Sequence, residues 1–200
     1  PMLKNSKPII IVAGEPKSVF FEIFFKSLKF KKYKRPLILI ASHKILNQQI
    51  KKFKFKKKIK IINLKDLKNI KFDNITINLI NVNYNNSSNK QKKEYIYHSF
   101  EIAFNLLKSG FSNKLINGPI NKNNFLKKKF LGITEFISKK FKKKKIAMLI
   151  YNKNLSVCPI TTHLPLKLVA KKISVKLIFE KTKLKNEFYI KNLGYKPKIA

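Results

Sequence analysis

The sequence lacks the features that mark secreted and membrane proteins. Its only cysteine is Cys158, so no disulfide can form within the chain, and a reducing cytoplasm is the expected location. The longest apolar run, Pro8 to Gly14, is far below the roughly 18 residues that a membrane span needs. The run is also followed by no small-residue cleavage site, so we predict neither a signal peptide nor a membrane partner.

Arginine is almost absent, although the net charge is +37. All but one of the 46 basic residues are lysines, the exception being Arg35. Proteins that bind phosphates or recognise bases favour arginine, because its planar guanidinium group makes bidentate contacts that lysine cannot make. The lysines are also spread along the chain, and Lys, Asn, Ile and Phe share A/T-rich codons. We therefore interpret the charge as nucleotide bias and expect no specific nucleic acid, with a basic nucleic-acid-binding protein as the alternative.

Glycine is scarce as well, at 5 residues, and neither a GxGxxG nor a GxxxxGK[ST] loop occurs. A Rossmann or P-loop nucleotide site is therefore not predicted. The apolar fraction of 44% is too high for a disordered chain. A chain of 200 residues can bury a sizeable core, as one domain or two small ones.

The periodicity of apolar residues predicts strands that alternate with helices. We expect strands over Ile9–Ala13, Pro36–Ile40, Ile59–Leu64, Ile75–Val82 and Leu115–Ile116; helices over Ser18–Phe30, Lys44–Phe53 and Tyr95–Lys108; and a helix that opens at Pro165. Residues 83–93 read as a loop, and residues 146–151 and 155–160 as an antiparallel hairpin. This order predicts an α/β fold, a mostly parallel sheet with helices on both faces. The ends of the chain, with Pro1 before Met2 and a new apolar stretch after Pro197, indicate a fragment.

Three loops that follow predicted strands are candidates for chemistry, because ligands of open α/β sheets collect at the carboxyl ends of strands. They are Gly14-Glu15-Pro16, residues 117–122 and the Thr162-His163 turn. Gly118 allows close approach of the backbone to a ligand, and Lys122 could meet a phosphate.

Of the three histidines, His43 and His98 have the pattern of surface residues. At its strand end, His163 is either a metal ligand or base, or a loop histidine bonded to a carbonyl, and its position alone does not decide between them. Cys158 is expected to be buried in a strand and not to act as a nucleophile.

Four segments in this order resemble the 4-hydroxythreonine-4-phosphate dehydrogenase family. They are Gly14-Glu15-Pro16, Asn117-Gly118-Pro119-Ile120-Asn121-Lys122, Gly132-Ile133-Thr134-Glu135-Phe136 and Thr161-Thr162-His163-Leu164-Pro165-Leu166. Order and spacing agree from about Lys7 to Ala200. The resemblance implies the fold of isocitrate and isopropylmalate dehydrogenases, two α/β lobes around a cleft, here truncated before the second half is complete. We place a lobe boundary near Leu115.

The resemblance also implies an activity in vitamin B6 (pyridoxal phosphate) synthesis. Family members are homodimers that oxidise 4-phosphooxy-L-threonine with NAD, and loss of CO2 then gives 3-amino-2-oxopropyl phosphate. A divalent metal (Zn, Mg, Mn or Co) is held by three histidines, of which His163 matches the first, and Thr134 matches a substrate-contacting threonine. The other ligands and the NAD site would follow residue 200, so the 200 residues alone are expected to be inactive.

Two positions depart from the family pattern. Ile133 stands where the family usually has a substrate-contacting histidine, and isoleucine can neither donate a hydrogen bond nor carry charge. Residues 17–20 replace a glycine-containing turn. These departures leave two further hypotheses: a dehydrogenase for a different phosphorylated hydroxy acid, and a catalytically dead relative.

Overall fold

Five short parallel strands form the sheet of this protein. They are β1 (Ile9–Val12), β2 (Leu37–Ala41), β3 (Ile59–Ile61), β4 (Ile77–Asn81) and β5 (Leu115–Asn117), in the spatial order β3-β4-β2-β1-β5. The computed structural model describes residues 7–67, 69–85, 88–121, 132–142, 146–162 and 164–199. Strand β1 pairs with β2 on one side, at Ile10 and Ile38, and with β5 on the other, at Ile10 and Leu115. The predicted parallel α/β fold is confirmed.

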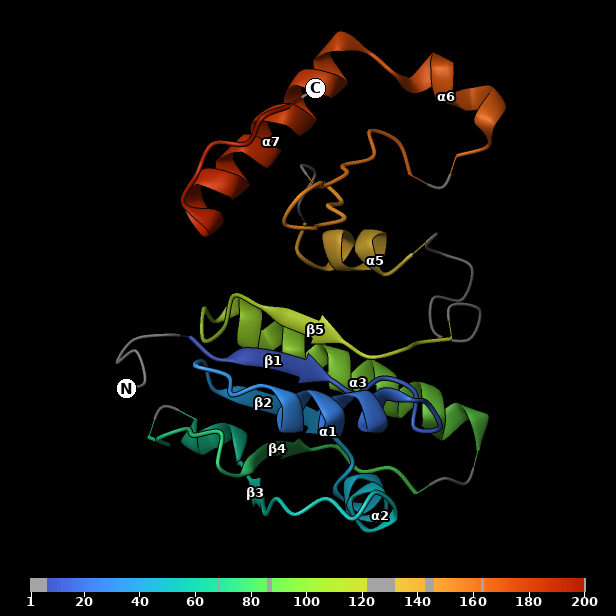
Figure 1. The fold of residues 1–200 in the computed structure, drawn as a ribbon. Helices are drawn as coiled ribbons and strands as arrows, with labels where there is room; N and C mark the ends of the chain where they lie inside the picture. The colour runs from blue at the N-terminus through green and yellow to red at the C-terminus, as the bar shows by residue number, and fades with distance from the viewer. Residues whose placement is uncertain are drawn as a thin grey trace. The chain divides into compact units, whose positions relative to one another are not determined.

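Helices cover both faces of this sheet, as predicted. Helix α1 (Phe20–Phe30) lies in front of the sheet in Figure 1, next to α2 (His43–Lys52), and α3 (Asn89–Lys108) lies behind it. A one-turn 3-10 helix, η1 (Leu64–Asp66), follows β3. Residues of these elements belong to one compact unit, Pro1–Lys127, and a second unit spans Lys128–Ala200. The predicted lobe boundary near Leu115 concerns the two-lobed fold of the family and stays a prediction.

Aromatic side chains explain how α1 and α3 pack on the sheet. Helix α1 buries a phenylalanine stripe at 20, 21, 24 and 25, the spacing of one helical face. Phe100 of α3 is fully buried, as are Ile10, Ile38 and Leu79 of the strands beneath the helices. Each such side chain removed from water contributes about 2 kcal/mol, so this shared core holds the strand ends in fixed positions.

Helix α3 begins earlier than the sequence predicted. Residues 83–93 were predicted to be a loop, but α3 starts at Asn89. The Ser88 side chain accepts a hydrogen bond from the backbone N–H of Gln91, at 3.2 Å, and so caps the first turn. Of the polar residues that suggested a loop, 89–93 are instead the solvent-facing start of a helix, while 83–85 and 88 lie in no helix.

The second unit contains three described helices, α5 (Ile133–Lys140), α6 (Leu166–Lys172) and α7 (Val175–Leu193). Pro165 is the N-cap residue of α6, so the helix that was predicted to open there is confirmed. The predicted hairpin is wrong in extent: Ile150 and Val157 form an isolated antiparallel bridge, with N–H···O distances of 2.8 and 2.9 Å. In the described part of the chain, no helix is long and apolar enough to cross a membrane.

Candidate active site at the carboxyl edge of the sheet

Two of the three predicted loops meet in the structure. Since β1 and β5 are parallel neighbours, the loops that follow them leave from the same edge of the sheet. The backbone N–H of Gly118 donates to the carbonyl of Val12 at 2.7 Å, and the N–H of Glu15 donates to the carbonyl of Pro119 at 2.8 Å. The third loop belongs to the second unit, and His163 lies outside the described residues.

Glycine is required on both sides of this contact. A Cβ on Gly118 would stand 2.0 Å from the carbonyl oxygen of Ala13, and one on Gly14 would stand 2.3 Å from that of Pro119. Gly14 also has a φ of +77°, in the left-handed region that favours glycine. Gly118 was predicted to let the backbone approach a ligand. In the structure its backbone lies against that of the neighbouring loop, and its approach to a ligand stays a prediction.

Glu15 lies at the centre of the two loops, and the sequence analysis assigned it no role. The residue is only 9% exposed. Its Oε2 pairs with Lys92 Nζ of α3 at 2.5 Å, and its Oε1 accepts a hydrogen bond from the backbone N–H of Asn121 at 3.1 Å. The one signal in the sequence was an acidic residue at a strand end in a chain with only 9 acidic residues.

The ends of β2 and β4 add a polar network to the same edge. The backbone N–H of Ser42 donates to the Tyr95 hydroxyl at 3.3 Å, and that of His43 donates to Asn81 Oδ1 at 2.8 Å. Burial raises the pKa of Tyr95 to about 12, so the phenol stays protonated at neutral pH. These groups are bonded within the protein and stabilise the edge.

Of the other residues that the sequence analysis named, the structure describes His43, His98 and Cys158. His98 is exposed on α3, as predicted, while His43 is half-buried, with its Nε2 3.0 Å from Asn47 Nδ2. Cys158 is half-buried and lies in no strand, so its predicted burial in a strand is wrong. Lys122 and His163 lie outside the described residues, and their roles stay predictions.

Thr134 and its neighbour Ile133 form the start of α5. Both are half-buried, and Gly132, which precedes them, provides no side-chain cap. The first N–H groups of a helix have no partner within the helix and favour anions. One carboxylate oxygen of Glu135, Oε2, is buried without a hydrogen-bond partner. The turn thus offers a hydroxyl and backbone donors to a polar ligand, next to this buried carboxylate oxygen.

The described residues include no group of three or more His, Cys, Asp or Glu side chains that could hold a metal. Glu15, the buried carboxylate at the sheet edge, is already engaged by a lysine and a backbone N–H. A metal site as the family resemblance implies it would depend on His163 and on ligands outside the described part of the chain.

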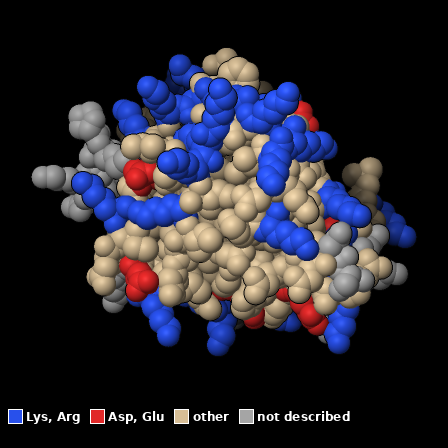
Figure 2. Space-filling model, turned by 90° about the horizontal axis from the view of Figure 1, so that it is seen from below, with Lys and Arg blue, Asp and Glu red and all other residues tan. Residues whose placement is uncertain are grey.

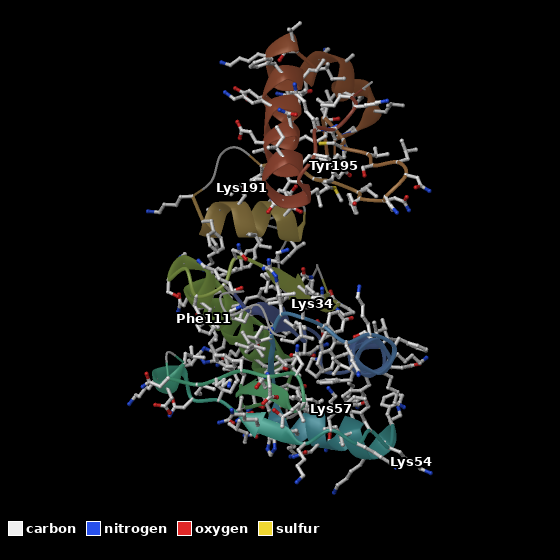
Figure 3. All side chains as sticks on the ribbon, turned by 60° about the vertical axis from the view of Figure 1, so that its left-hand side comes forward. Lys34, Lys54, Lys57, Phe111, Lys191 and Tyr195 are labelled. Carbon is white, nitrogen blue, oxygen red and sulfur yellow. The ribbon has the colours of Figure 1, made fainter. Side chains whose placement is uncertain are left out.

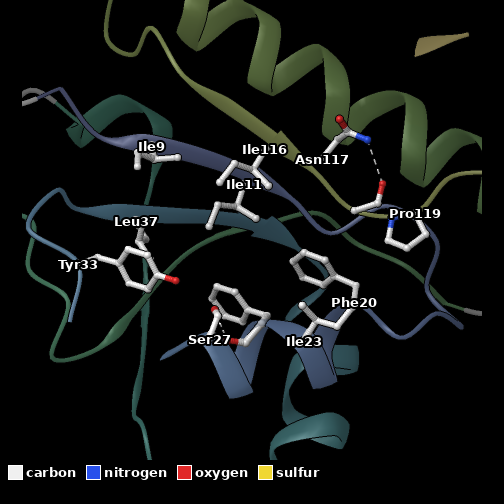
Figure 4. A pocket seen from close by; sticks show the side chains of 12 residues that line it. Ile9, Ile11, Phe20, Ile23, Ser27, Tyr33, Leu37, Ile116, Asn117 and Pro119 are labelled. Carbon is white, nitrogen blue, oxygen red and sulfur yellow. Dashed lines mark hydrogen bonds between the residues drawn. The ribbon is translucent and has the colours of Figure 1, made fainter. Parts of the chain in front are cut away.

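An apolar groove of about 340 Å³ lies beside the two loops, between α1 and the strands β1 and β5 (Figure 4). Its lining includes Ile11, Phe20, Ile23 and Ile116, and no charged side chain. A phosphorylated molecule would find no cation there. The groove is therefore a poor site for such a substrate.

Lysines line a second hollow, of about 320 Å³, formed by Lys29, Lys54, Lys56 and Lys57 around Leu28 and Phe55. These residues lie in the last turn of α1 or between α2 and β3, at the amino edge of the sheet; Lys54 and Lys57 are labelled in Figure 3. The hollow is thus at the edge opposite the two loops and forms no part of the candidate active site.

The family model and the similar proteins reported below all indicate the same family. The family model described as "Pyridoxal phosphate biosynthetic protein PdxA" matches residues 32–200. The chain is 30% identical to a 4-hydroxythreonine-4-phosphate dehydrogenase of Sulfurihydrogenibium sp. (strain YO3AOP1), over 96% of this chain and 61% of the relative. Identity to the protein of the same name from Aquifex aeolicus (strain VF5) is 28%, over 97% of this chain and 61% of that relative. The chain thus spans less than two thirds of these relatives.

Solved structures agree on the fold. A crystal structure of 4-hydroxythreonine-4-phosphate dehydrogenase from Klebsiella pneumoniae is similar with a TM-score of 0.77 and 21% identity, over 95% of this chain and 61% of that one. The structure of such an enzyme from Burkholderia phymatum also has a TM-score of 0.77, with 22% identity, over 94% of this chain and 59% of that one. These likenesses support the same α/β architecture.

Proposed function

We propose a function that proceeds from one fact: the chain belongs to the family of the pyridoxal phosphate biosynthetic protein PdxA. The protein acts in that synthesis as a 4-hydroxythreonine-4-phosphate dehydrogenase, the name its relatives carry. The substrate hydroxyl is oxidised as hydride passes to NAD and the hydroxyl proton is lost. The β-keto acid then loses CO2 to give 3-amino-2-oxopropyl phosphate. The family match over residues 32–200 is the observation that carries the proposal.

Three residues of this chain are assigned to substrate and metal. Thr134, in the first turn of α5, binds the substrate through its hydroxyl, next to helix N–H groups that favour an anion. Lys122 supplies a positive charge for the phosphate, and His163 is one ligand of a divalent metal. Such a metal (Zn, Mg, Mn or Co), when bound, acts as a Lewis acid on the substrate oxygen atoms. The protein works as a homodimer in the cytoplasm, where the lone cysteine stays reduced.

The test is metal analysis and NAD reduction with the protein at the full length that its gene encodes. We expect His163→Ala to lose most of the bound metal and to lower the rate with 4-phosphooxy-L-threonine by about 100-fold or more. The control is His98→Ala, because His98 is exposed on α3. Undiminished metal content in His163→Ala would refute the ligand assignment. The 200-residue chain on its own is expected to show no NAD reduction.

A second candidate follows from Ile133, at the first position of α5. The side chain there can neither donate a hydrogen bond nor carry charge, unlike the histidine that the family usually has. A dehydrogenase for another phosphorylated hydroxy acid, or a relative without catalysis, would fit this replacement. NAD reduction with a panel of phosphorylated hydroxy acids separates these alternatives, since only the last gives no rate with any of them.

A further inference from the structure

We propose that Glu15 is a positioning residue that fixes the loop after β5 at the carboxyl edge of the sheet. The importance of this loop for activity rests on the proposed function, which assigns Lys122 of the same loop to the substrate phosphate. The geometry itself is independent of that function. Glu15 connects three segments that are distant in the sequence: the loop after β1, the first turns of α3 at Lys92, and the loop after β5 at Asn121.

Each oxygen of the Glu15 carboxylate has a separate partner. Oε1 accepts from the backbone N–H of Asn121 at 3.1 Å, and Oε2 lies 2.5 Å from Lys92 Nζ. The Glu15 side chain is 10% exposed and that of Lys92 is 28% exposed, so solvent screens this pair only partly. A carboxylate used in this way is a poor candidate for a base or a metal ligand, because both of its oxygen atoms are already engaged.

The pair of glycine contacts orders the loop only as far as Pro119. Gly118 and Pro119 are bonded directly to Val12 and Glu15 through the backbone. Asn121 is two residues further on, and the Glu15 side chain reaches its N–H. Lys92 in turn prevents the carboxylate from rotating away, because a buried charge left without its partner is costly. Lys92 thereby acts on the loop through Glu15.

The first measurement is hydrogen exchange at the Asn121 amide, followed by NMR in the full-length protein. We expect Lys92→Met and Glu15→Gln each to speed this exchange about tenfold, which corresponds to about 1.4 kcal/mol of local stability. Lys92→Arg keeps a cation and should restore slow exchange. The double variant should exchange no faster than the faster single variant, because both changes break one chain of contacts. Lys93→Met is the matched control, since Lys93 is exposed on the same helix.

The Gly118 amide, bonded to Val12, is an internal reference for general loosening of the sheet edge. The proposal is overturned if Asn121 exchanges at the wild-type rate in Lys92→Met and Glu15→Gln, or if Gly118 and Asn121 accelerate equally.

The second measurement separates positioning from a merely structural role. We expect Lys92→Met to raise KM for 4-phosphooxy-L-threonine about tenfold with a smaller change in kcat, because a displaced loop weakens binding before it affects the chemistry. Lys92→Arg should return KM toward the wild-type value. Faster Asn121 exchange with an unchanged KM would mean that Glu15 orders the loop without positioning it for substrate. A wild-type protein that does not reduce NAD would refute the proposed function, while the exchange experiment would still decide the role of Glu15 in the loop.

Discussion

At the scale of single residues, the two loops after β1 and β5 meet through a close contact between backbones. Ala13 and Gly118, far apart in the sequence, approach so closely that a methyl group on Gly118 would meet the Ala13 carbonyl at 2.0 Å. Neither strand can move away without loss of the hydrogen bonds that join β1 to β5. The two loops therefore tolerate very little change at this contact.

We predict that Gly118→Ala lowers the free energy of unfolding by about 3 kcal/mol, because the new methyl group overlaps backbone atoms that cannot give way. Gly110→Ala is the matched control. Gly110 has a φ of +75°, but its Cβ would meet only Lys7 Nζ, at 3.8 Å. The control should therefore lose about 1 kcal/mol, from the left-handed backbone alone. Urea unfolding of both variants measures the difference, and equal losses would show that the loops adapt.

The sequence could predict that Gly118 matters but could not identify its partner. A Gly-Pro pair after a strand indicates a strand end and close backbone approach, and β5 does end at Asn117, with the Gly118 backbone against Ala13. The partner of Gly118 is set by the pairing of β1 with β5, and no local pattern encodes which strands become neighbours. The same reason concealed Glu15, whose bonding partners, Lys92 and Asn121, lie on other segments.

At the scale of elements, the capping of α3 decides where the polar stretch after β4 becomes ordered. The helix extends over Asn89–Lys108, and its first turns contain mostly polar residues that bury little surface. Its later turns carry the buried Ile96, Phe100 and Phe104. The start of the helix thus depends on local hydrogen bonding more than on packing.

We predict that Ser88→Ala destabilises the first unit by about 1 kcal/mol, since the N–H of Gln91 loses its acceptor. Ser88→Asp restores an acceptor and adds a charge that is favourable at a helix start, so it should recover the lost stability. Urea unfolding followed by circular dichroism checks both values. Equal stability of the Ser88→Ala and Ser88→Asp variants would contradict the role of the cap.

Elements built from strong local patterns were predictable, and the exceptions have a common cause. Apolar runs predicted all five strands of the sheet, and apolar residues at helical spacing (19, 20, 23, 24 and 28) predicted α1, although the face that it buries is 20, 21, 24 and 25. The hairpin of residues 146–160 had alternating residues too, yet Leu155 is 76% exposed and Val157 is 52% exposed. Strands gain stability from burial of one face, and these residues lack that burial. Residues 146–160 thus have the sequence pattern of two strands but not the burial that stabilises strands.

At the scale of the whole molecule, charge is the dominant surface property. Lysines are spread over the face shown in Figure 2, around a broad area without charged residues. In the described part of the chain, the ion pairs that the structure shows include Lys26 with Glu22 and Lys92 with Glu15. Nine acidic residues cannot neutralise 46 basic ones, so the molecule attracts any polyanion.

We predict that the protein binds DNA or RNA weakly and without sequence preference, and that raised salt abolishes this binding. Counterion release makes such binding fall steeply between about 50 and 200 mM salt. Fluorescence anisotropy with oligonucleotides of unrelated sequence, over a salt series, is the measurement. Tight binding that discriminates between sequences and survives 200 mM salt would instead support the nucleic-acid-binding alternative.

The position of β1 between β2 and β5 also has a consequence for how the chain acquires its shape during translation. The first neighbour of β1 ends at Ala41, but the second ends only at Asn117. At a synthesis rate of about 5 to 20 residues per second, the earliest strand waits several seconds on the ribosome with one edge open. The turn bearing Glu15 becomes complete only after that wait, so it is the last part of the sheet edge to form.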